Sequence, residues 1–113
     1  MNVIFHVSSG DVHDWKHALS NAQNLLADET VETETVTFVA NGDAVHLLVE
    51  GTPVRDRVEG LLEDGVRCCV CRNSLQNRDI DSASVVDDVV VVPSGVGELA
   101  TRQAAGDAYL KVP

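Results

Sequence analysis

All three cysteines of the 113-residue chain lie within four consecutive positions, at Cys68, Cys69 and Cys71. They stand in the run GVRCCVCRNSL at residues 65–75. A cysteine thiolate can act as a nucleophile, a metal ligand or a redox group, and a buried cysteine can also be a small inert hydrophobe. Which of these applies depends on where each sulfur lies in the fold.

Two of these chemistries fit the spacing poorly. A zinc site needs a second pair of ligands, which the sequence lacks, and we therefore expect no metal and no cofactor. The histidines are scattered along the chain, at His6, His13, His17 and His46. Cys68 and Cys71 form a C-x-x-C pair, but a redox pair needs both sulfurs in the first turn of a helix. A buried structural Cys71, a dithiol switch and a single reactive thiol remain as alternatives.

The segments around the cysteines alternate between strand and helix patterns. Apolar, β-rich stretches predict strands at 2–7, 32–39, 66–71, 88–93 and 108–112. Apolar spacing, capping residues and terminal glycines predict helices at 13–27, 44–51, 53–64, 94–106 and from residue 73 or 74 onward. This alternation predicts an α/β fold with one parallel sheet and helices on both faces. The valine run at 89–92 predicts that the fourth strand is buried on both faces.

Cys71 is the last residue of its predicted strand and stands just before a predicted helix. Chemistry in parallel α/β sheets gathers at the carboxyl ends of strands, and a helix start favours an anion. We therefore expect a lowered pKa and a reactive thiolate at Cys71. Arg72 should add positive charge, and Asn73 and Ser74 should cap the helix or donate hydrogen bonds to the sulfur.

The other cysteines and the first loop complete this interpretation. Cys68 and Cys69 lie inside the predicted strand, where neighbouring side chains point to opposite faces, so we expect both to be buried and inert. The loop SSGD at 8–11 ends at the same edge of the sheet as Cys71. We therefore expect Ser8 and Ser9 to line a pocket there, although the loop has no phosphate-binding glycine pattern.

The charge balance limits the partners. The chain has 18 acidic and 8 basic residues, a net charge of −10, and only two of the basic residues are lysines. Such a charge repels nucleic acid and anionic lipid, which excludes both as main partners. Acidity with few lysines favours a protein adapted to high salt, and an ordinary acidic protein is the alternative. With no export signal and no apolar stretch that could span a membrane, we expect a single cytoplasmic domain over residues 1–113.

Five stretches of the sequence, taken in order, resemble small single-domain proteins of the DsrE/DsrF-like family with the YchN-like fold. They are VIFHVSS, ALSNAQNLLAD, VANGDAVHLLV, GVRCCVCRNSL and the segment from VVPSGVGEL to DAYLKVP; the most specific parts are CRNSL at 71–75 and VPSGVGEL at 92–99. The resemblance spans essentially the whole chain. It implies a three-layer α/β/α fold around a five-stranded parallel sheet, assembled into homotrimers or hexamers. It also implies a persulfide on the cysteine of a C-x-N-[ST] motif, which here is Cys71.

Two functions are therefore considered. The first is a cytoplasmic, sulfurtransferase-like sulfur carrier that takes sulfane sulfur from a donor protein onto Cys71 and passes it to an acceptor. The second is a non-catalytic oligomeric module that binds a small ligand or regulates, with Cys71 only lining the pocket. A fully buried thiol without polar neighbours would favour the second. For the oligomer, we expect the fourth strand and the apolar segment 44–49 to be buried between copies.

Overall fold

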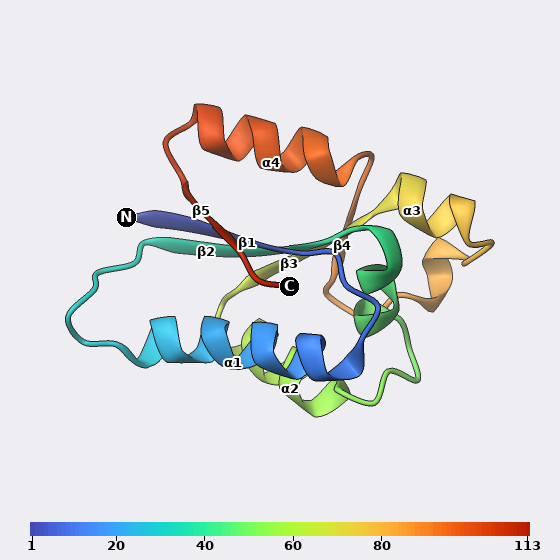
Figure 1. The fold of residues 1–113 in the computed structure, drawn as a ribbon, viewed down its shortest axis with the longest axis horizontal. Coiled ribbons are helices and arrows are strands. Elements are labelled where there is room, and N and C mark those ends of the chain that lie inside the picture. Colours follow the sequence, from blue (N-terminus) through green and yellow to red (C-terminus); the bar gives the residue numbers. More distant parts are fainter.

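The computed structural model describes all 113 residues. The chain forms one five-stranded parallel sheet with helices on both faces (Figure 1). The strands are β1 (Asn2–Val7), β2 (Thr35–Ala40), β3 (Arg67–Cys71), β4 (Val90–Val92) and β5 (Ala108–Lys111). The α-helices are α1 (Val12–Ala27), α2 (Arg55–Glu63), α3 (Arg72–Asn77) and α4 (Gly95–Ala104). Two 3-10 helices are η1 (Gly42–Leu48) and η2 (Ser82–Ser84). The predicted fold class is confirmed.

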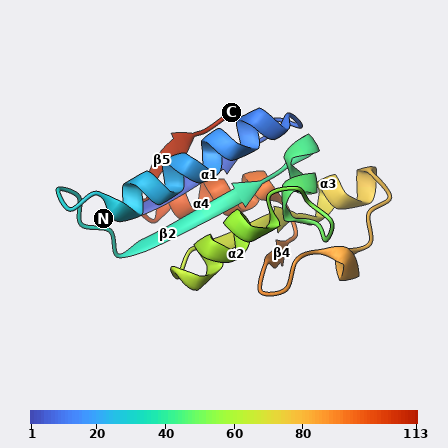
Figure 2. The ribbon, with the colours of Figure 1, turned by 90° about the horizontal axis from the view of Figure 1, so that it is seen from below.

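The strand order is β4-β3-β2-β1-β5, and every neighbouring pair is parallel. Helix α4 covers one face of the sheet, whereas α1 and α2 lie side by side on the other (Figures 1 and 2). This is the three-layer α/β/α arrangement. No helix combines the length and the apolar character needed to cross a bilayer.

Alternation along the strands divides the core into two parts. On the side of α1 and α2, a cluster of 24 buried residues includes Phe5 and Phe38, whose ring centroids are 6.4 Å apart. The side of α4 holds a smaller cluster of five, made of Ile4, Val39, Cys69, Val92 and Leu99. The smaller core lies beneath α4, and Gly95 at the start of that helix lies against Cys71.

Two expectations about apolar surface are wrong. Strand β4 is not buried on both faces within the chain: it is an edge strand, Val90 is 38% exposed, and only Val92 of its three residues is buried. The reason is that β4 pairs with β3 on one side only. In the segment 44–49, the four residues Ala44, Val45, Leu47 and Leu48 are fully buried within the chain, so that segment has no free apolar face.

The parallel order brings the carboxyl ends of the strands to one edge of the sheet, where η1 and α3 lie (Figure 1). Ala40 of β2 pairs with Val70 of β3, and Cys71 pairs with Val92 of β4. The residues that follow β2 and β4 therefore flank Cys71 on its two sides.

Candidate functional site

Cys71 ends β3 and at the same time caps α3. Its backbone is extended (φ −76°, ψ 116°), and its sulfur accepts a hydrogen bond from the Ser74 N–H, with the nitrogen 3.4 Å away. The backbone N–H groups of Asn73 and of Gly95, the first residue of α4, also favour the thiolate form of this sulfur. The Cys71 residue is 5% exposed. The sulfur therefore lies between the first turns of two helices, just below the surface.

These contacts determine how Cys71 ionises. Burial by itself would raise the pKa of the thiol, because it penalises the thiolate. Hydrogen bonds from the Ser74 side chain and from the N–H groups of Gly95, Ser74 and Asn73 act in the opposite direction and outweigh burial. The pKa of Cys71 is therefore lower than that of an ordinary thiol.

The two other cysteines behave differently. Cys68 belongs to the larger core and Cys69 to the smaller one, as the alternation of the strand predicts. Burial, with a smaller contribution from Cys69, raises the pKa of Cys68 to about 12. Burial also raises the pKa of Cys69 to about 11, although Arg67 donates a hydrogen bond to its sulfur over 3.0 Å. Only one of the three thiols is prepared to form a thiolate.

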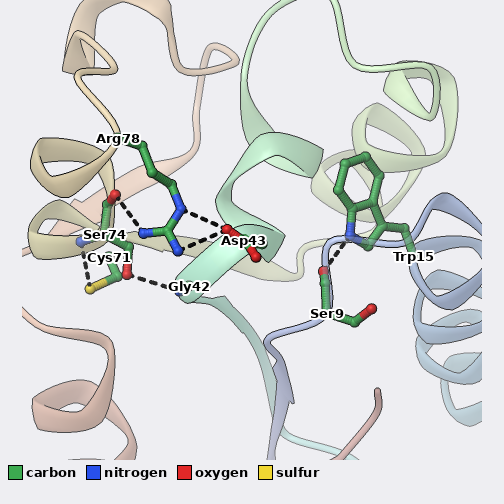
Figure 3. Close-up of polar contacts among 7 residues, drawn as sticks. All are labelled: Ser9, Trp15, Gly42, Asp43, Cys71, Ser74 and Arg78. Atoms are coloured by element: carbon green, nitrogen blue, oxygen red, sulfur yellow. Dashed lines mark hydrogen bonds and ion pairs between the residues drawn. The ribbon is translucent and has the colours of Figure 1, made fainter.

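The neighbours predicted for Cys71 contribute unequally. Ser74 is buried, and its hydroxyl oxygen accepts a hydrogen bond from the Gly42 N–H over 2.9 Å, which ties α3 to η1 (Figure 3). Asn73 contributes its backbone N–H, while its side chain is exposed. Arg72 is exposed and donates no hydrogen bond to the sulfur, and it is absent from the groups that lower the pKa of Cys71. The exposed guanidinium of Arg72 therefore makes no hydrogen bond to the sulfur of Cys71.

Ser8 and Ser9 do not come together with Cys71, because β2 separates β1 from β3 in the sheet. The Ser8 hydroxyl accepts a hydrogen bond from Lys111 Nζ over 2.9 Å. Ser9 donates its hydroxyl to Asp14 over 2.6 Å, and its carbonyl accepts from Trp15 Nε1 over 2.6 Å. Figure 3 shows Ser9 and Trp15 on the far side of η1 from Cys71. Ser9 therefore stabilises the entry into α1, and Ser8 contacts the end of β5.

An ion pair that sequence reasoning missed supports the first turn of α3, which follows Cys71. Arg78 Nε and Nη2 donate to the same Asp43 carboxylate oxygen over 3.0 and 2.8 Å (Figure 3). Arg78 Nη1 also donates to the Ser74 carbonyl over 3.1 Å. The pair holds η1 against α3 and so fixes the turn that carries Ser74. Its members are 35 residues apart, and no local pattern relates them.

A second missed group flanks Cys71 on the side of α4. Asn41 directly follows β2, and its side-chain oxygen lies 2.8 Å from His6 Nε2. His6 Nδ1 in turn lies 2.7 Å from the Tyr109 hydroxyl. Burial lowers the pKa of His6; the hydrogen bond to Asn41 opposes this effect and Lys111 adds to it. No three or more His, Cys, Asp or Glu side chains gather closely enough to hold a metal ion.

Comparison with known proteins agrees with this architecture. The structure matches MTH1491 of Methanobacterium thermoautotrophicum, described as a protein of unknown function, with 33% identity, a TM-score of 0.91 and 97% of each chain covered. It also matches the ychN protein of E. coli, with 20% identity, a TM-score of 0.81, and 98% of this chain and 99% of that one covered. BT1422 of Bacteroides thetaiotaomicron matches at 14% identity and a TM-score of 0.72, with 96% and 94% covered. These last two comparisons speak for the fold alone, and no curated protein matches the chain.

The family model that matches spans residues 1–112, which includes every strand and helix and the whole surroundings of Cys71. The motif residues Cys71, Asn73 and Ser74 all lie within this match, at the carboxyl end of β3 and the start of α3. The chain belongs to the DsrE/DsrF-like family.

Proposed function

We propose that this protein is a sulfur-relay protein that carries sulfane sulfur as a persulfide on Cys71. The observation that carries the proposal is the contrast among the three thiols. Cys71 alone has a lowered pKa, whereas the pKa values of Cys68 and Cys69 are raised to about 12 and about 11. Membership of the DsrE/DsrF-like family supports the same chemistry.

The transfer needs only thiolate chemistry. The Cys71 thiolate attacks the outer sulfur of a donor persulfide, R–S–SH. A new S–S bond forms as the donor's S–S bond breaks, which gives Cys71–S–SH and releases R–S⁻. An acceptor thiolate, R′–S⁻, then attacks the outer sulfur, which gives R′–S–SH and restores the Cys71 thiolate. No net oxidation occurs, so neither step requires a metal or a redox cofactor.

The N–H groups around Cys71 have a defined part in both steps. They stabilise negative charge on the sulfur when Cys71 attacks, and again when it leaves. The Cys71 sulfur is thus prepared both as a nucleophile and as a leaving group, which suits a carrier that must load and unload. With the sulfur just below the surface, a partner must approach over the starts of α3 and α4.

The second candidate function is a non-catalytic ligand-binding module, and the 5% exposure of Cys71 favours it. The polar surroundings of the sulfur oppose it, because an inert buried thiol has no need of several hydrogen-bond donors. The protein's partners under the first proposal are a sulfur donor and an acceptor protein in the cytoplasm. We further propose a homotrimer or hexamer, for which Val90 and Val96 supply exposed apolar side chains.

The test is to incubate the protein with a small-molecule persulfide and to measure its intact mass. One extra sulfur is expected on the wild-type protein and on Cys69→Ser, and none on Cys71→Ser. Addition of an acceptor thiol should return the wild-type mass to its starting value. Sulfur uptake by folded Cys71→Ser, or no uptake by the wild type, would favour the binding module.

A further inference from the structure

Three side chains from β5, β1 and the end of β2 form a hydrogen-bonded chain that leads toward Cys71. The Tyr109 hydroxyl lies 2.7 Å from His6 Nδ1, and His6 Nε2 lies 2.8 Å from Asn41 Oδ1. Tyr109 is exposed, His6 is half-buried, and Asn41 stands beside Cys71 because Ala40 and Val70 pair in the sheet. The chain thus runs from the surface to the site.

The chemistry of the groups fixes the direction of each bond. Asn41 Oδ1 can only accept, so His6 Nε2 must carry the proton that it donates. In a neutral ring Nδ1 then accepts from the Tyr109 hydroxyl, and the lowered pKa of His6 keeps the ring neutral at pH 7. The result is an Asn41 amide whose oxygen is held by His6 and whose NH₂ group points away from it.

The NH₂ group of Asn41 lies close to Gly95, the residue that also lies against Cys71. A Cβ atom placed on Gly95 would lie 3.6 Å from Asn41 Nδ2 and 3.4 Å from Cys71 Cβ, so both side chains meet over the same glycine. The N–H of Gly95 is also one of the groups that lower the pKa of Cys71. The one side-chain hydrogen bond that Asn41 makes within the protein is that of its Oδ1 with His6, which leaves Nδ2 available as a donor.

The position of Asn41 makes this arrangement unusual. Asn41 is the N-cap residue of η1, where an Asn side chain ordinarily accepts a hydrogen bond from the first turn. Here it makes no capping bond. Its amide is instead turned toward His6 and the α4 side of the sheet, which gives up a local contact for a distant one. Such a departure from local preference is typical of functional positions.

We propose that the Asn41 amide donates a hydrogen bond to the outer sulfur of the Cys71 persulfide, and that His6 and Tyr109 are positioning residues that hold the amide in place. The inference rests on the proposed sulfur-relay function. The outer sulfur lies about 2 Å beyond the sulfur of Cys71, past the N–H groups that surround the inner atom. It carries the negative charge of an ionised persulfide and therefore needs a donor of its own.

The experiment measures the equilibrium constant for loading the full-length protein from a small-molecule persulfide. Asn41→Ala should lower that constant about tenfold or more, because a hydrogen bond to a charged group is lost. Asn41→Asp has the same shape but replaces the donor by a negatively charged acceptor, so it should lower loading at least as much. Asn41→Ala should leave the alkylation rate of unloaded Cys71 within about threefold of wild type, since the inner sulfur keeps its backbone donors. Asn41→Asp should slow that alkylation as well, because its carboxylate also disfavours the nearby thiolate.

Two substitutions of His6 test whether its Nε2–H group, rather than the size of its side chain, positions the Asn41 amide. The side-chain nitrogen of Gln can take the place of Nε2, so His6→Gln should load within about twofold of wild type. The shorter side chain of His6→Asn reaches only the place of Nδ1, so this variant should lose about as much sulfur loading as Asn41→Ala. Equal loading by these two variants would overturn the positioning role of His6.

The controls distinguish this inference from the proposed function. Thermal unfolding of each variant establishes that it is folded, and Asn41→Asp serves if Asn41→Ala does not fold. Wild-type loading by both Asn41 variants would overturn the inference and leave the sulfur-relay proposal intact. No loading of the wild-type protein itself would overturn both.

Discussion

The three cysteines should react with an alkylating reagent at very different rates in the folded protein. An ordinary cysteine has a pKa of 9.0, whereas burial raises that of Cys69 to about 11 and that of Cys68 to about 12. At pH 7 the thiolate fraction is therefore about 100-fold smaller at Cys69 and about 1000-fold smaller at Cys68 than at an ordinary thiol. The lowered pKa of Cys71 gives it more thiolate than an ordinary thiol.

The reactivity of each thiolate reduces this contrast without removing it. Nucleophilicity rises with pKa by about half a logarithmic unit per pKa unit, which offsets half of the difference. Relative to an ordinary thiol, about tenfold slower alkylation then remains for Cys69 and about thirtyfold for Cys68. Because both side chains are almost completely buried, the measured ratios to Cys71 should be larger than these values.

The assay is a time course of alkylation at pH 7, stopped with acid and read out peptide by peptide by mass spectrometry. Cys71 should be labelled first, and the other two only as the chain unfolds. The same time course in concentrated urea should bring all three rates together. Labelling of Cys69 in the folded protein as fast as that of Cys71 would refute the argument from burial and hydrogen bonding.

Three further predictions concern packing, pH and salt. Gly95→Ala places a Cβ 3.1 Å from Asn41 Cβ and 3.4 Å from Cys71 Cβ. This substitution should therefore cost about 1–3 kcal/mol of stability and raise the midpoint of the pH–alkylation profile of Cys71. The Cβ of Gly97→Ala meets only ordinary contacts, so that substitution should do neither. The pKa of Cys68 is about 12 in the folded protein and 9.0 in the unfolded chain, so the unfolded chain loses its proton first. The stability from this group is therefore present below pH 9 and should fall above it by up to about 1.4 kcal/mol per pH unit. Urea titrations should show a shallower fall in Cys68→Ala. With a net charge of −10, the melting temperature should rise from low to molar salt as carboxylate repulsion is screened, and a flat or falling curve would contradict adaptation to salt.

The sequence predicts the fold class and the place of the reactive cysteine because both depend on local patterns. Alternating strand and helix patterns specify a parallel sheet, and the boundary between β3 and α3 is marked by the change of pattern at Cys71. The side chains of Cys68 and Cys69 point to opposite faces of the sheet because successive side chains alternate along a strand. Each of these inferences needs only a few neighbouring residues.

What the sequence does not predict depends on the order of the strands. The edge position of β4 makes Val90 exposed, and the place of β2 between β1 and β3 keeps Ser9 away from Cys71. The contacts of His6 with Tyr109 and Asn41 likewise join segments that become neighbours only through the sheet. Parallel strands are joined by crossovers that leave no short-range signal of order, so these contacts appear only in three dimensions.

Sulfur transfer through Cys71 is tested most directly by following isotopically labelled sulfane sulfur from a donor persulfide to an acceptor thiol. The wild-type protein is loaded, freed of the donor and trapped by alkylation, and the label is located by peptide mass spectrometry. The account predicts that the label lies on Cys71 alone and that an acceptor thiol added before trapping removes all of it. Label on Cys68 or Cys69 of the folded protein, or label on Cys71 that no acceptor thiol removes, would contradict it.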